Sequence, residues 1–296
     1  MSSAILEPTT DKESQGASLP DCRMTSADYV RLTKLVYETS GICLNDSKKV
    51  MVETRLRKRL RDTGASNFAE YWQLLRNGAD REKELVRLID VMSTNKTDFF
   101  REPRHFEYLK EQLLPSLAPK LRSENRALGV WSAGCSSGKE PYTLAMVLSD
   151  AKEKGIIDDF DIQATDISTD VLKQASRAVY REEDIEPIPE ASRKKYLLRS
   201  RDRQSPSYRI IPELRKLVRF SRLNLMDGSY EVDKPLDIIF CRNVMIYFDR
   251  PTQEGIVRRF GSCLRRGGHF FLGHSESLNG LSTGLKPIAP TIYRKD

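Results

Sequence analysis

Residues 130–142 read VWSAGCSSGKEPY, and this stretch decides the fold. A run of apolar and small residues ends at Gly134, serines and a second glycine follow, and Lys-Glu-Pro opens a predicted helix over 139–153. A strand, a glycine-rich turn and a helix in this order form one unit of a parallel α/β sheet, with the turn facing a ligand. The turn also carries Glu140, which disfavours phosphate, because phosphate needs donors and positive charge.

The same alternation continues toward the C-terminus. The sequence predicts strands at 128–134, 160–166, 235–241, 268–273 and 290–295, and helices at 139–153, 168–178 and 251–265. Strands that alternate with helices are typical of a doubly wound, Rossmann-like sheet. Residues 181–222 interrupt the pattern, and their segment SYRIIPELRKLVRFSR predicts a small antiparallel β insertion. We therefore expect one α/β domain over 128–296, with the insertion inside it.

The chain before this domain predicts only helices. Residues 1–21 are polar and lack apolar periodicity, which predicts a disordered tail. Residues 22–93 predict a small all-helical domain, with helices at 26–39, 47–62, 67–76 and 80–92. The region 94–127 joins the two domains, and it contains a predicted helix over about 103–117 that begins at Pro103.

Composition indicates a globular protein of the cytoplasm. Charged residues make up 31% of the chain and hydrophobic residues 39%, and no apolar run approaches the roughly 20 residues of a membrane span. The first residues lack the basic and apolar regions of a secretory signal. The five cysteines form no CxxC and the three histidines no paired spacing, so we expect neither a disulfide framework nor a metal site.

Much of the net charge of +7 lies in residues 48–61, KKVMVETRLRKRLR, where Glu53 is the one acid. An apolar stripe recurs there at every fourth position: Val52, Leu56 and Leu60. We expect an amphipathic helix whose other face carries Lys48, Arg55 and Arg59. This face is either solvated or docks on an acidic partner. A protein is favoured over nucleic acid, because no aromatic residues interleave the basic ones for stacking on bases.

Two strand ends suggest the ligand. Gly134 allows a tight turn and Gly138 a close backbone approach, but the spacing is not the GxGxxG of dinucleotide folds. Asp166 ends the second strand, where a partly exposed carboxylate can accept two hydrogen bonds from a ribose diol; it could instead cap the helix after it, as Ser168 could. A ribose acceptor, an amino-group acceptor at Glu140 and no phosphate clamp together favour S-adenosylmethionine over NAD or ATP.

At this point the sequence resembles a known family. The segments STNKTDFFREPRHF, WSAGCSSGKEPYTLAM, FCRNVMIYFD and GGHFFLGHSE are similar to the signature segments of the CheR-type chemotaxis methyltransferases. The resemblance runs from about residue 24 to the C-terminus. It implies a helical N-terminal domain that docks on receptors and a class I methyltransferase domain with a small antiparallel subdomain. It further implies a monomer that esterifies glutamate side chains on the cytoplasmic helical bundle of chemoreceptors.

The resemblance also implies roles for residues that match the family's motifs. The implied cofactor contacts are Asn95, Thr97, Arg101, Glu140, Asp166, Asn224, Leu225, Arg242 and Asn243. Within this set Glu140 matches the acceptor for the methionine amino group, Asp166 the ribose ligand, and Asn224 with Leu225 the pair beside the adenine. Arg101 and Tyr247 are the catalytic candidates, as groups that orient the acceptor carboxylate rather than as bases. A stripe of Lys48, Arg55 and Arg59 would offer charge complementary to a glutamate-rich receptor.

The chain departs from the family pattern at two places. Lys139 stands where members usually carry the first of two acids, and we expect activity to survive because Glu140 is the cofactor contact. In the insertion, RSRDRQSPSYR replaces a glycine-containing loop of members that bind a peptide at the receptor's C-terminal tail. We therefore expect direct docking on the receptor bundle, without tethering to a C-terminal pentapeptide.

Two other functions remain open at the level of sequence. A nucleic-acid methyltransferase would fit the basic composition, but the loop after the strand at 235–241 reads CRNVMIYF and lacks the proline-rich segment used for amino groups of bases. A module that binds S-adenosylmethionine or receptors without transferring methyl would also fit. Intact cofactor positions argue against it.

Overall fold

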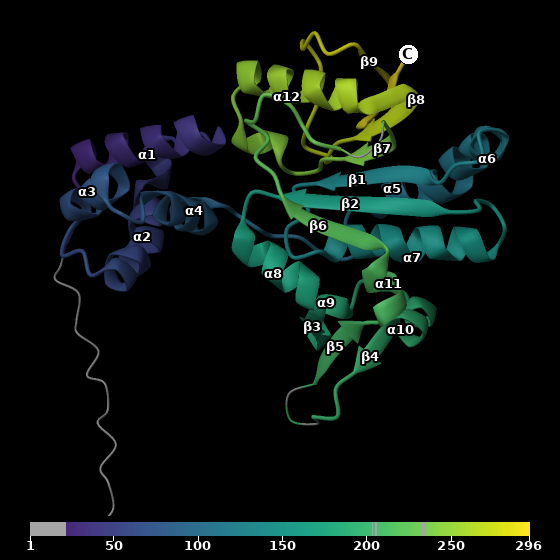
Figure 1. Cartoon of the computed structure of the whole chain (residues 1–296), viewed down its shortest axis with the longest axis horizontal. Coiled ribbons are helices and arrows are strands. Elements are labelled where there is room, and N and C mark those ends of the chain that lie inside the picture. The colour runs from purple at the N-terminus through teal and green to yellow at the C-terminus, as the bar shows by residue number, and fades with distance from the viewer. Residues whose placement is uncertain (1–21, 203, 205, 233–234) are drawn as a thin grey trace, which may run out of the picture.

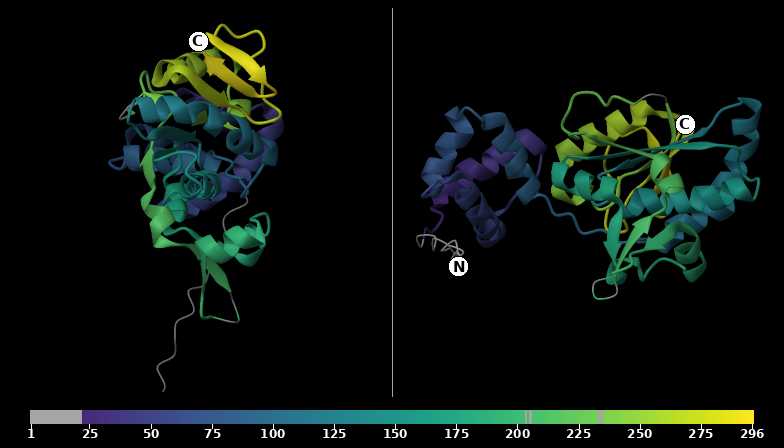
Figure 2. Two further views of the ribbon diagram at one scale, coloured as in Figure 1. Left: turned by 90° about the vertical axis from the view of Figure 1, so that its right-hand side faces the viewer. Right: turned by 60° about the horizontal axis from the view of Figure 1, so that its bottom comes forward.

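The computed structural model describes residues 22–202, 204, 206–232 and 235–296, so the tail predicted for residues 1–21 lies outside the described residues. Figure 1 shows a helical bundle at the N-terminal end, beside a larger body in which helices flank a sheet. A small second sheet projects from the larger body, and Figure 2 shows it from two further directions.

The larger body is built on a seven-stranded sheet in the order β6-β2-β1-β7-β8-β10-β9. Its strands are β1 (Leu128–Ala133), β2 (Phe160–Asp166), β6 (Val218–Arg222), β7 (Leu236–Phe240), β8 (Leu264–Phe271), β9 (Leu285–Ala289) and β10 (Ile292–Lys295). The first five in spatial order are parallel, and β10 runs antiparallel to both β8 and β9. The α/β class predicted from the sequence is confirmed. The edge strand β9 was not predicted, because Pro287 and its exposed neighbours do not resemble a buried strand.

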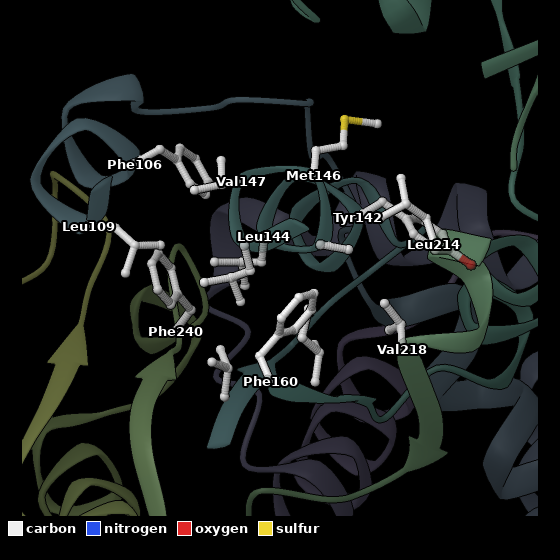
Figure 3. Packing of buried hydrophobic residues seen from close by; sticks show 14 of the residues in the cluster. Phe106, Leu109, Tyr142, Leu144, Met146, Val147, Phe160, Leu214, Val218 and Phe240 are labelled. Carbon is white, nitrogen blue, oxygen red and sulfur yellow. The ribbon is translucent and has the colours of Figure 1, made fainter. Parts of the chain in front are cut away.

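Helices cover both faces of this sheet. The helices α7 (Lys139–Glu153) and α8 (Thr169–Arg177) lie on one face, and α12 (Arg250–Cys263) lies on the other (Figure 1). Successive residues of a strand point to opposite faces of the sheet and pack in different cores. Val130 packs in the core under α7, and Trp131 packs in the core under α12. Figure 3 shows the first core, where aromatic and aliphatic side chains from helices and strands interlock. Burial on both faces explains the near-continuous apolar runs of the parallel strands.

The connection between the two bodies is more helical than the sequence predicts. It forms α5 (Pro103–Tyr108), a π-helical turn (Leu109–Leu113) and α6 (Leu114–Ser123). The predicted helix ended at about 117, because Pro119 follows in an otherwise polar segment. That end is wrong: Pro119 lacks one intrahelical N–H bond, yet Ala118 and Leu121 are buried and hold the last turn against the core.

The insertion ends earlier than the range 181–222 that the sequence predicts. Its elements are β3 (Val179–Arg181), α9 (Glu182–Ile185), α10 (Glu190–Tyr196), β4 (Leu197–Arg199), β5 (Ser207–Ile210) and α11 (Pro212–Lys216). The strands form an antiparallel sheet in the order β3-β5-β4, as the sequence suggested. However, β6 belongs to the main sheet, where it pairs in parallel with β2. The alternation of residues in the sequence does not tell whether this strand pairs within the insertion or with β2 of the main sheet.

The N-terminal bundle contains α1 (Ser26–Ser40), α2 (Lys49–Thr63), α3 (Phe68–Asn77) and α4 (Arg81–Met92), and a 3₁₀ turn (Asp46–Lys48) precedes α2. These match the four predicted helices to within two residues at each end. Thr25 and Asp28 form a capping box at the start of α1, and Asn67 caps α3 by accepting a hydrogen bond from the Glu70 N–H. Gly41 and Gly64 end α1 and α2 at φ 73°, a conformation that favours glycine.

Candidate active site

A pocket opens at the carboxyl ends of β1, β2 and β7, where α/β sheets bind ligands. It is lined by every residue that the sequence suggested for the cofactor and for catalysis: Asn95, Thr97, Arg101, Glu140, Asp166, Asn224, Leu225, Arg242, Asn243 and Tyr247. These residues come from segments more than a hundred positions apart in the chain. The fold therefore gathers them at one place, although their individual contacts with a ligand stay predictions.

The glycine-rich turn after β1 is shaped by its neighbours. Gly134 has φ 76°, and a Cβ atom there would lie 2.5 Å from Cγ2 of Val244 in the loop after β7. Gly138 has φ 87°, and a Cβ there would lie 2.9 Å from the Cβ of Ala175 in α8. Both glycines thus combine left-handed backbone with close packing against another element. They hold the turn between the loop after β7 and α8.

Asp166 is more buried than the sequence suggested. The sequence predicted a partly exposed carboxylate, but the residue is only 8% exposed. Its Oδ2 accepts a hydrogen bond from the Ser136 N–H at 2.8 Å, and its Oδ1 accepts one from the Ser168 N–H at 2.9 Å. Burial raises the pKa of Asp166, although these backbone donors act in the opposite direction. Each oxygen keeps a lone pair that a ribose hydroxyl could use.

Capping of α8 falls to Ser168, whose hydroxyl accepts from the Val171 N–H. The alternative role for Asp166, as the cap of this helix, is therefore taken by its neighbour. Asp166 instead ties the turn after β1 to the end of β2. This places its carboxylate in the pocket wall and fixes its orientation.

Glu140 and Arg242 form a buried ion pair on the pocket floor. Glu140 Oε2 accepts from Arg242 Nε at 2.7 Å, and Glu140 Oε1 accepts from the Ser132 hydroxyl at 2.7 Å. Each of the two charged residues is less than a tenth exposed. Because a carboxylate has about four lone-pair sites, Glu140 can still accept a bond from an amino group in the pocket.

Arg242 also organises the segment before α5. Its Nη1 donates to the carbonyl oxygen of Arg101 at 2.7 Å and lies 3.5 Å from Oε2 of Glu102. The guanidinium lies over the rings of Phe106 and Phe240, at 5.2 and 5.5 Å from their centroids. Arg242 thus joins the start of α7 and the loop after β7 to the connection between the domains.

A possible metal-ligand cluster lies beside this arginine, formed by Glu102, His105 and His274, with candidate atoms within 4.8 Å of one another. Arg242 Nη1 lies 3.3 Å from Nδ1 of His105, so a fixed positive charge already occupies the approach to two of the three groups. Burial, and then the charge of Arg242, lower the pKa of His105 to about 4, which keeps its ring neutral. We assign no metal to this cluster.

The loop after β7 is held by a residue that sequence reasoning missed. Glu276 is 6% exposed, and its carboxylate accepts from the backbone N–H groups of Asn243 at 2.8 Å, Gly273 at 2.7 Å and Ile246 at 3.3 Å. Asn243 has φ 59°, so this clamp supports a left-handed residue at the pocket. Burial raises the pKa of Glu276. In the sequence, the one indication of a role for Glu276 was its position in GGHFFLGHSE, a segment that carries the family resemblance.

The segment from residue 94 to 101 forms another wall. Asn95 contributes its carbonyl oxygen, which accepts from the Ser136 hydroxyl at 2.8 Å, while Arg101 Nη1 donates to the Lys96 carbonyl oxygen at 3.0 Å. The Tyr247 hydroxyl donates to the Thr94 carbonyl oxygen at 3.4 Å. Arg101 and Tyr247, the two catalytic candidates, therefore approach the pocket from different segments, and both are half-buried.

The N-terminal bundle closes the pocket, a contribution the sequence did not reveal. The Cys43 N–H donates to the carbonyl oxygen of Tyr247 at 2.9 Å, and Asn224 Nδ2 donates to that of Thr39 at 2.7 Å. The bundle adds these residues to the lining: Ser40, Ile42, Cys43, Leu44, Lys48 and Met51. Adjacent contacts fasten α4 to α8, where Asp90 accepts from the backbone and hydroxyl of Thr169 at 2.8 and 2.9 Å.

The basic face of α2 differs from the prediction. Lys48 is exposed and lines the pocket. Arg55 donates to the carbonyl oxygens at the end of α4, including that of Met92 at 2.8 Å, and Arg59 forms ion pairs with Glu84 and Asp62 at 2.7 Å. The expectation that both arginines present free charge to solvent is wrong, because each satisfies a group inside the bundle. The exposed cations of α2 are Lys58 and Arg61.

Lys139 does not line the pocket. It is buried, and its Nζ lies 2.8 Å from Oδ1 of Asp184 and 3.9 Å from Asp98. Its charge is thus matched by an acid of α9 and by one in the segment before α5. This accounts physically for a lysine at a position beside Glu140.

Comparison with known proteins identifies the family of this chain. The SAM-binding domain model of the CheR methyltransferases matches residues 95–293, and the all-alpha domain model of the same family matches residues 27–93. The chemotaxis protein methyltransferase of Borreliella burgdorferi is 41% identical, over 92% of this chain and 95% of the relative. Chemotaxis protein methyltransferase 2 of Pseudomonas aeruginosa is 38% identical, over 91% and 93%, and the Escherichia coli enzyme is 37% identical, over 91% and 91%.

No helix among the described residues is long and apolar enough to cross a membrane. Glu140 and Asp166 line the pocket with carboxylates, which can accept hydrogen bonds from the amino and hydroxyl groups that S-adenosylmethionine carries. The family models cover both bodies of the fold. The chain therefore belongs to the CheR methyltransferase family and is an S-adenosylmethionine-dependent protein methyltransferase.

Proposed function

We propose that this protein transfers a methyl group from S-adenosylmethionine to glutamate side chains in the cytoplasmic helical bundle of chemoreceptors. The relatives are named chemotaxis protein methyltransferases, which supports this class of substrate. One observation carries the proposal: the buried lining of the pocket holds two acids, Glu140 and Asp166, against one cation, Arg242. The more exposed lining holds three cations without acidic partners among the described residues: Lys48, Lys96 and Arg101. A pocket of this polarity suits a cationic donor below an anionic acceptor.

The floor would hold the donor. Glu140 would accept from its amino group and Asp166 from its ribose, while Asn224 and Leu225 would lie beside its adenine. The remaining contacts we propose are Asn95, Thr97, Arg101, Arg242 and Asn243. Because Glu140 and Asp166 are already fixed by protein donors, they need no reorganisation when the ligand binds.

The rim would hold the acceptor. Lys48, Lys96 and Arg101 line the pocket, and none of the three forms an ion pair with a carboxylate in the described part of the chain. A glutamate carboxylate that enters between them exchanges water for cationic donors. Arg101 and Tyr247 come from different segments, but both donate to carbonyl oxygens of the same stretch, those of Lys96 and Thr94. This supports a role for both in orienting one acceptor carboxylate.

The reaction needs no general base. The free glutamate side chain has a pKa near 4.3, so it is ionised at neutral pH. Bound S-adenosylmethionine supplies an electrophilic methyl group, and transfer to the carboxylate oxygen leaves a methyl ester and S-adenosylhomocysteine. The protein's part is alignment, which can supply about 7–11 kcal/mol of the barrier. Arg101 and Tyr247 act as orienting groups, and no proton moves.

We further propose that the enzyme acts as a monomer in the cytoplasm and docks on the receptor bundle without binding a C-terminal pentapeptide. The charged segment RSRDRQSPSYR in the insertion supports the last point. Docking by the N-terminal bundle would use Lys48, with Lys58 and Arg61 as the exposed cations on α2. Arg55 and Arg59 contribute indirectly, by holding α2 against α4.

The test is methyl transfer from tritiated S-adenosylmethionine to purified cytoplasmic fragments of chemoreceptors. Base-labile methyl counts on the fragments support the proposal, because carboxyl methyl esters hydrolyse in alkali. A matched fragment with its glutamates changed to alanine should take up no label. Cofactor binding without transfer to any receptor fragment would indicate a non-catalytic module, and base-stable label on nucleic acid would indicate the other alternative.

A further inference from the structure

A second concentration of positive charge lies outside the basic segment 48–61. Residues 173–222 contain fourteen Lys and Arg against seven Asp and Glu, an excess of seven that equals the net charge of the whole chain. This part comprises the end of α8, the insertion and β6. It lies apart from the basic helix α2 of the N-terminal bundle (Figure 1). Its charge needs its own explanation.

Several of these cations are neutralised and others are not, including four on α8, α11 and β6. Lys173 pairs with Asp170 at 3.1 Å, Arg219 with Asp161 at 3.0 Å, and Lys195 with Asp150 at 2.8 Å. In contrast, none of the following four side chains has a carboxylate within ion-pair distance among the described residues: Arg177, Arg215, Lys216 and Arg222. The buried Nε of Arg215 has no hydrogen-bond partner among them either.

These four residues border one groove. A hollow lined by Tyr142, Arg215 and Lys216 shares Ser176 and Phe220 with a second hollow, which is lined by Arg177 and Arg222. The two hollows therefore form a continuous groove between α8 on one side and α11 with β6 on the other. Phe220 is half-buried on its floor, with its ring 5.7 Å from that of Tyr142. We call this the α8–β6 groove.

The backbone of β6 is open along the groove. The strand lies at the edge of the sheet and pairs only with β2 within the described residues. The Leu217 carbonyl oxygen and the Leu223 N–H both bond to the β2 segment. Backbone groups alternate sides along a strand, so Val218, Phe220 and Arg222 direct their N–H and C=O groups away from the sheet. An extended chain could pair with them.

We propose that the α8–β6 groove binds an extended acidic segment of a protein partner, which adds to the open edge of β6 as a further strand. Main-chain hydrogen bonds to β6 would give affinity, as in other cases of strand addition, and the four unpaired cations would select acidic side chains. Phe220 would receive an apolar side chain between the acidic ones. This surface is separate from the methyl-transfer pocket, with which it shares no lining residue.

Charged residues on an edge strand have another use, which is to keep sheets from pairing edge to edge. That explanation accounts for Arg219 and Arg222 but not for cations on α8 and α11. It also predicts no affinity for an acidic strand. The two explanations therefore differ in a binding measurement.

The experiment uses the full chain and a fluorescein-labelled short peptide in which glutamate alternates with valine, measured by fluorescence anisotropy at low salt without cofactor. Wild type should bind, and Arg177→Glu with Arg222→Glu should weaken binding at least about tenfold, because two attractive contacts become repulsive. A matched reversal of two exposed cations elsewhere, Lys110→Glu with Arg266→Glu, should leave affinity within about twofold.

A second comparison tests strand pairing itself. Arg222→Ala removes a charge only, whereas Arg222→Pro also removes an N–H that points away from β2, so the proline variant should bind several-fold more weakly than the alanine variant. Circular dichroism spectra and unfolding midpoints of all variants establish that they are folded.

The proposal is overturned if wild type does not bind the peptide, or if the Arg177 and Arg222 reversal binds as well as the control reversal. Equal affinity of Arg222→Ala and Arg222→Pro for the peptide would show that the peptide does not pair with β6 as a strand. Two further probes are a single-stranded oligonucleotide of equal charge and vesicles with anionic lipid. Binding of either through these cations, when the peptide fails, would assign the surface to that class instead. Because no methyl transfer is measured, these outcomes are independent of the proposed reaction.

Discussion

Glu140, in the first turn of α7, and Arg242, in the loop after β7, are 102 residues apart in the chain, and their side chains meet at 2.7 Å on the floor of the pocket. The pair closes the gap between the turn after β1 and the loop after β7. Ser132 and the Arg101 carbonyl oxygen complete the hydrogen bonds on either side. A buried pair of this kind contributes little net stability when intact, yet removing one partner leaves an uncompensated charge. The site and its stability are therefore linked through these two residues.

Arg242→Met should destabilise the protein by about 3–5 kcal/mol, because Glu140 is left buried without its cation. The free energy of unfolding in urea measures this. The matched control is Lys173→Met, which breaks an exposed pair with Asp170 and should cost less than about 1 kcal/mol. Equal losses in the two variants would mean that the Glu140 pair contributes no more than a surface contact.

Asp166→Asn should weaken S-adenosylmethionine binding roughly tenfold to a hundredfold, since hydrogen bonds to a charged acceptor are worth about 1.5–3 kcal/mol. The amide would also turn a donor toward the N–H of Ser136 or Ser168, so a stability loss of about 1 kcal/mol should accompany the loss of affinity. Calorimetric titration compares this variant with Asp161→Asn, which lies on the same strand but outside the pocket. Unchanged affinity would exclude Asp166 from the ligand contacts.

Glu276→Gln should lower kcat roughly tenfold or more, with a smaller change in cofactor affinity. The amide keeps one acceptor oxygen but turns a donor toward backbone N–H groups of the loop that carries Asn243 and Tyr247. Glu276 lies outside the pocket lining, so its effect must act through that loop. Single-turnover rates measure the change in the methyl-transfer step, and cofactor titration measures the change in affinity. A loss of affinity as large as the loss of rate would contradict a role in positioning Tyr247.

The sequence predicts the elements of this fold better than their partners. The ranges of α7 and β2 agree with the prediction because glycine turns and buried runs mark both ends. β6 was assigned to the insertion, because local alternation does not say which strand it will pair with. The same limit applies at the site. Glu276 could not be found from spacing, since its function depends on backbone groups of a loop 33 residues away.

His269→Leu should change how stability depends on pH. Burial, and then the charge of Arg294, lower the pKa of His269 to about 4, compared with 6.5 for an unperturbed histidine. Its folded pKa lies below its unfolded pKa, so its contribution to stability is complete above 6.5 and is lost as pH falls toward 4. As pH falls through this window, the free energy of unfolding of the leucine variant should decrease less steeply than that of wild type, by up to about 1.4 kcal/mol per pH unit.

Urea unfolding at pH 7 and at pH 5 measures how the free energy of unfolding changes with pH, for the His269→Leu variant and for wild type. At pH 7 the substitution should be close to neutral, because the buried Nδ1 of His269 has no hydrogen-bond partner among the described residues. Identical slopes for the variant and wild type would show that His269 titrates normally in the folded state.

The exposed face of α2 gives the last prediction. Lys58→Glu with Arg61→Glu should leave cofactor affinity and the unfolding midpoint unchanged, since both side chains are exposed and outside the pocket. Receptor methylation should nevertheless fall at low salt, because complementary charge raises the rate of association. Arg55→Glu is the contrasting variant, and it should lower the unfolding midpoint because it breaks the contacts with the end of α4.

Salt separates docking from catalysis in this comparison. As ionic strength rises from 0.01 M to 0.15 M, the Debye length falls from about 30 Å to about 8 Å, so the wild-type rate should fall toward that of the double reversal. Initial rates of methylation at both ionic strengths, with receptor fragments well below saturation, measure this. If the double reversal methylates receptor as fast as wild type at low salt, then α2 is only a solvated face. Docking would then have to use another surface, and the charge of residues 181–222 makes the insertion the next region to test.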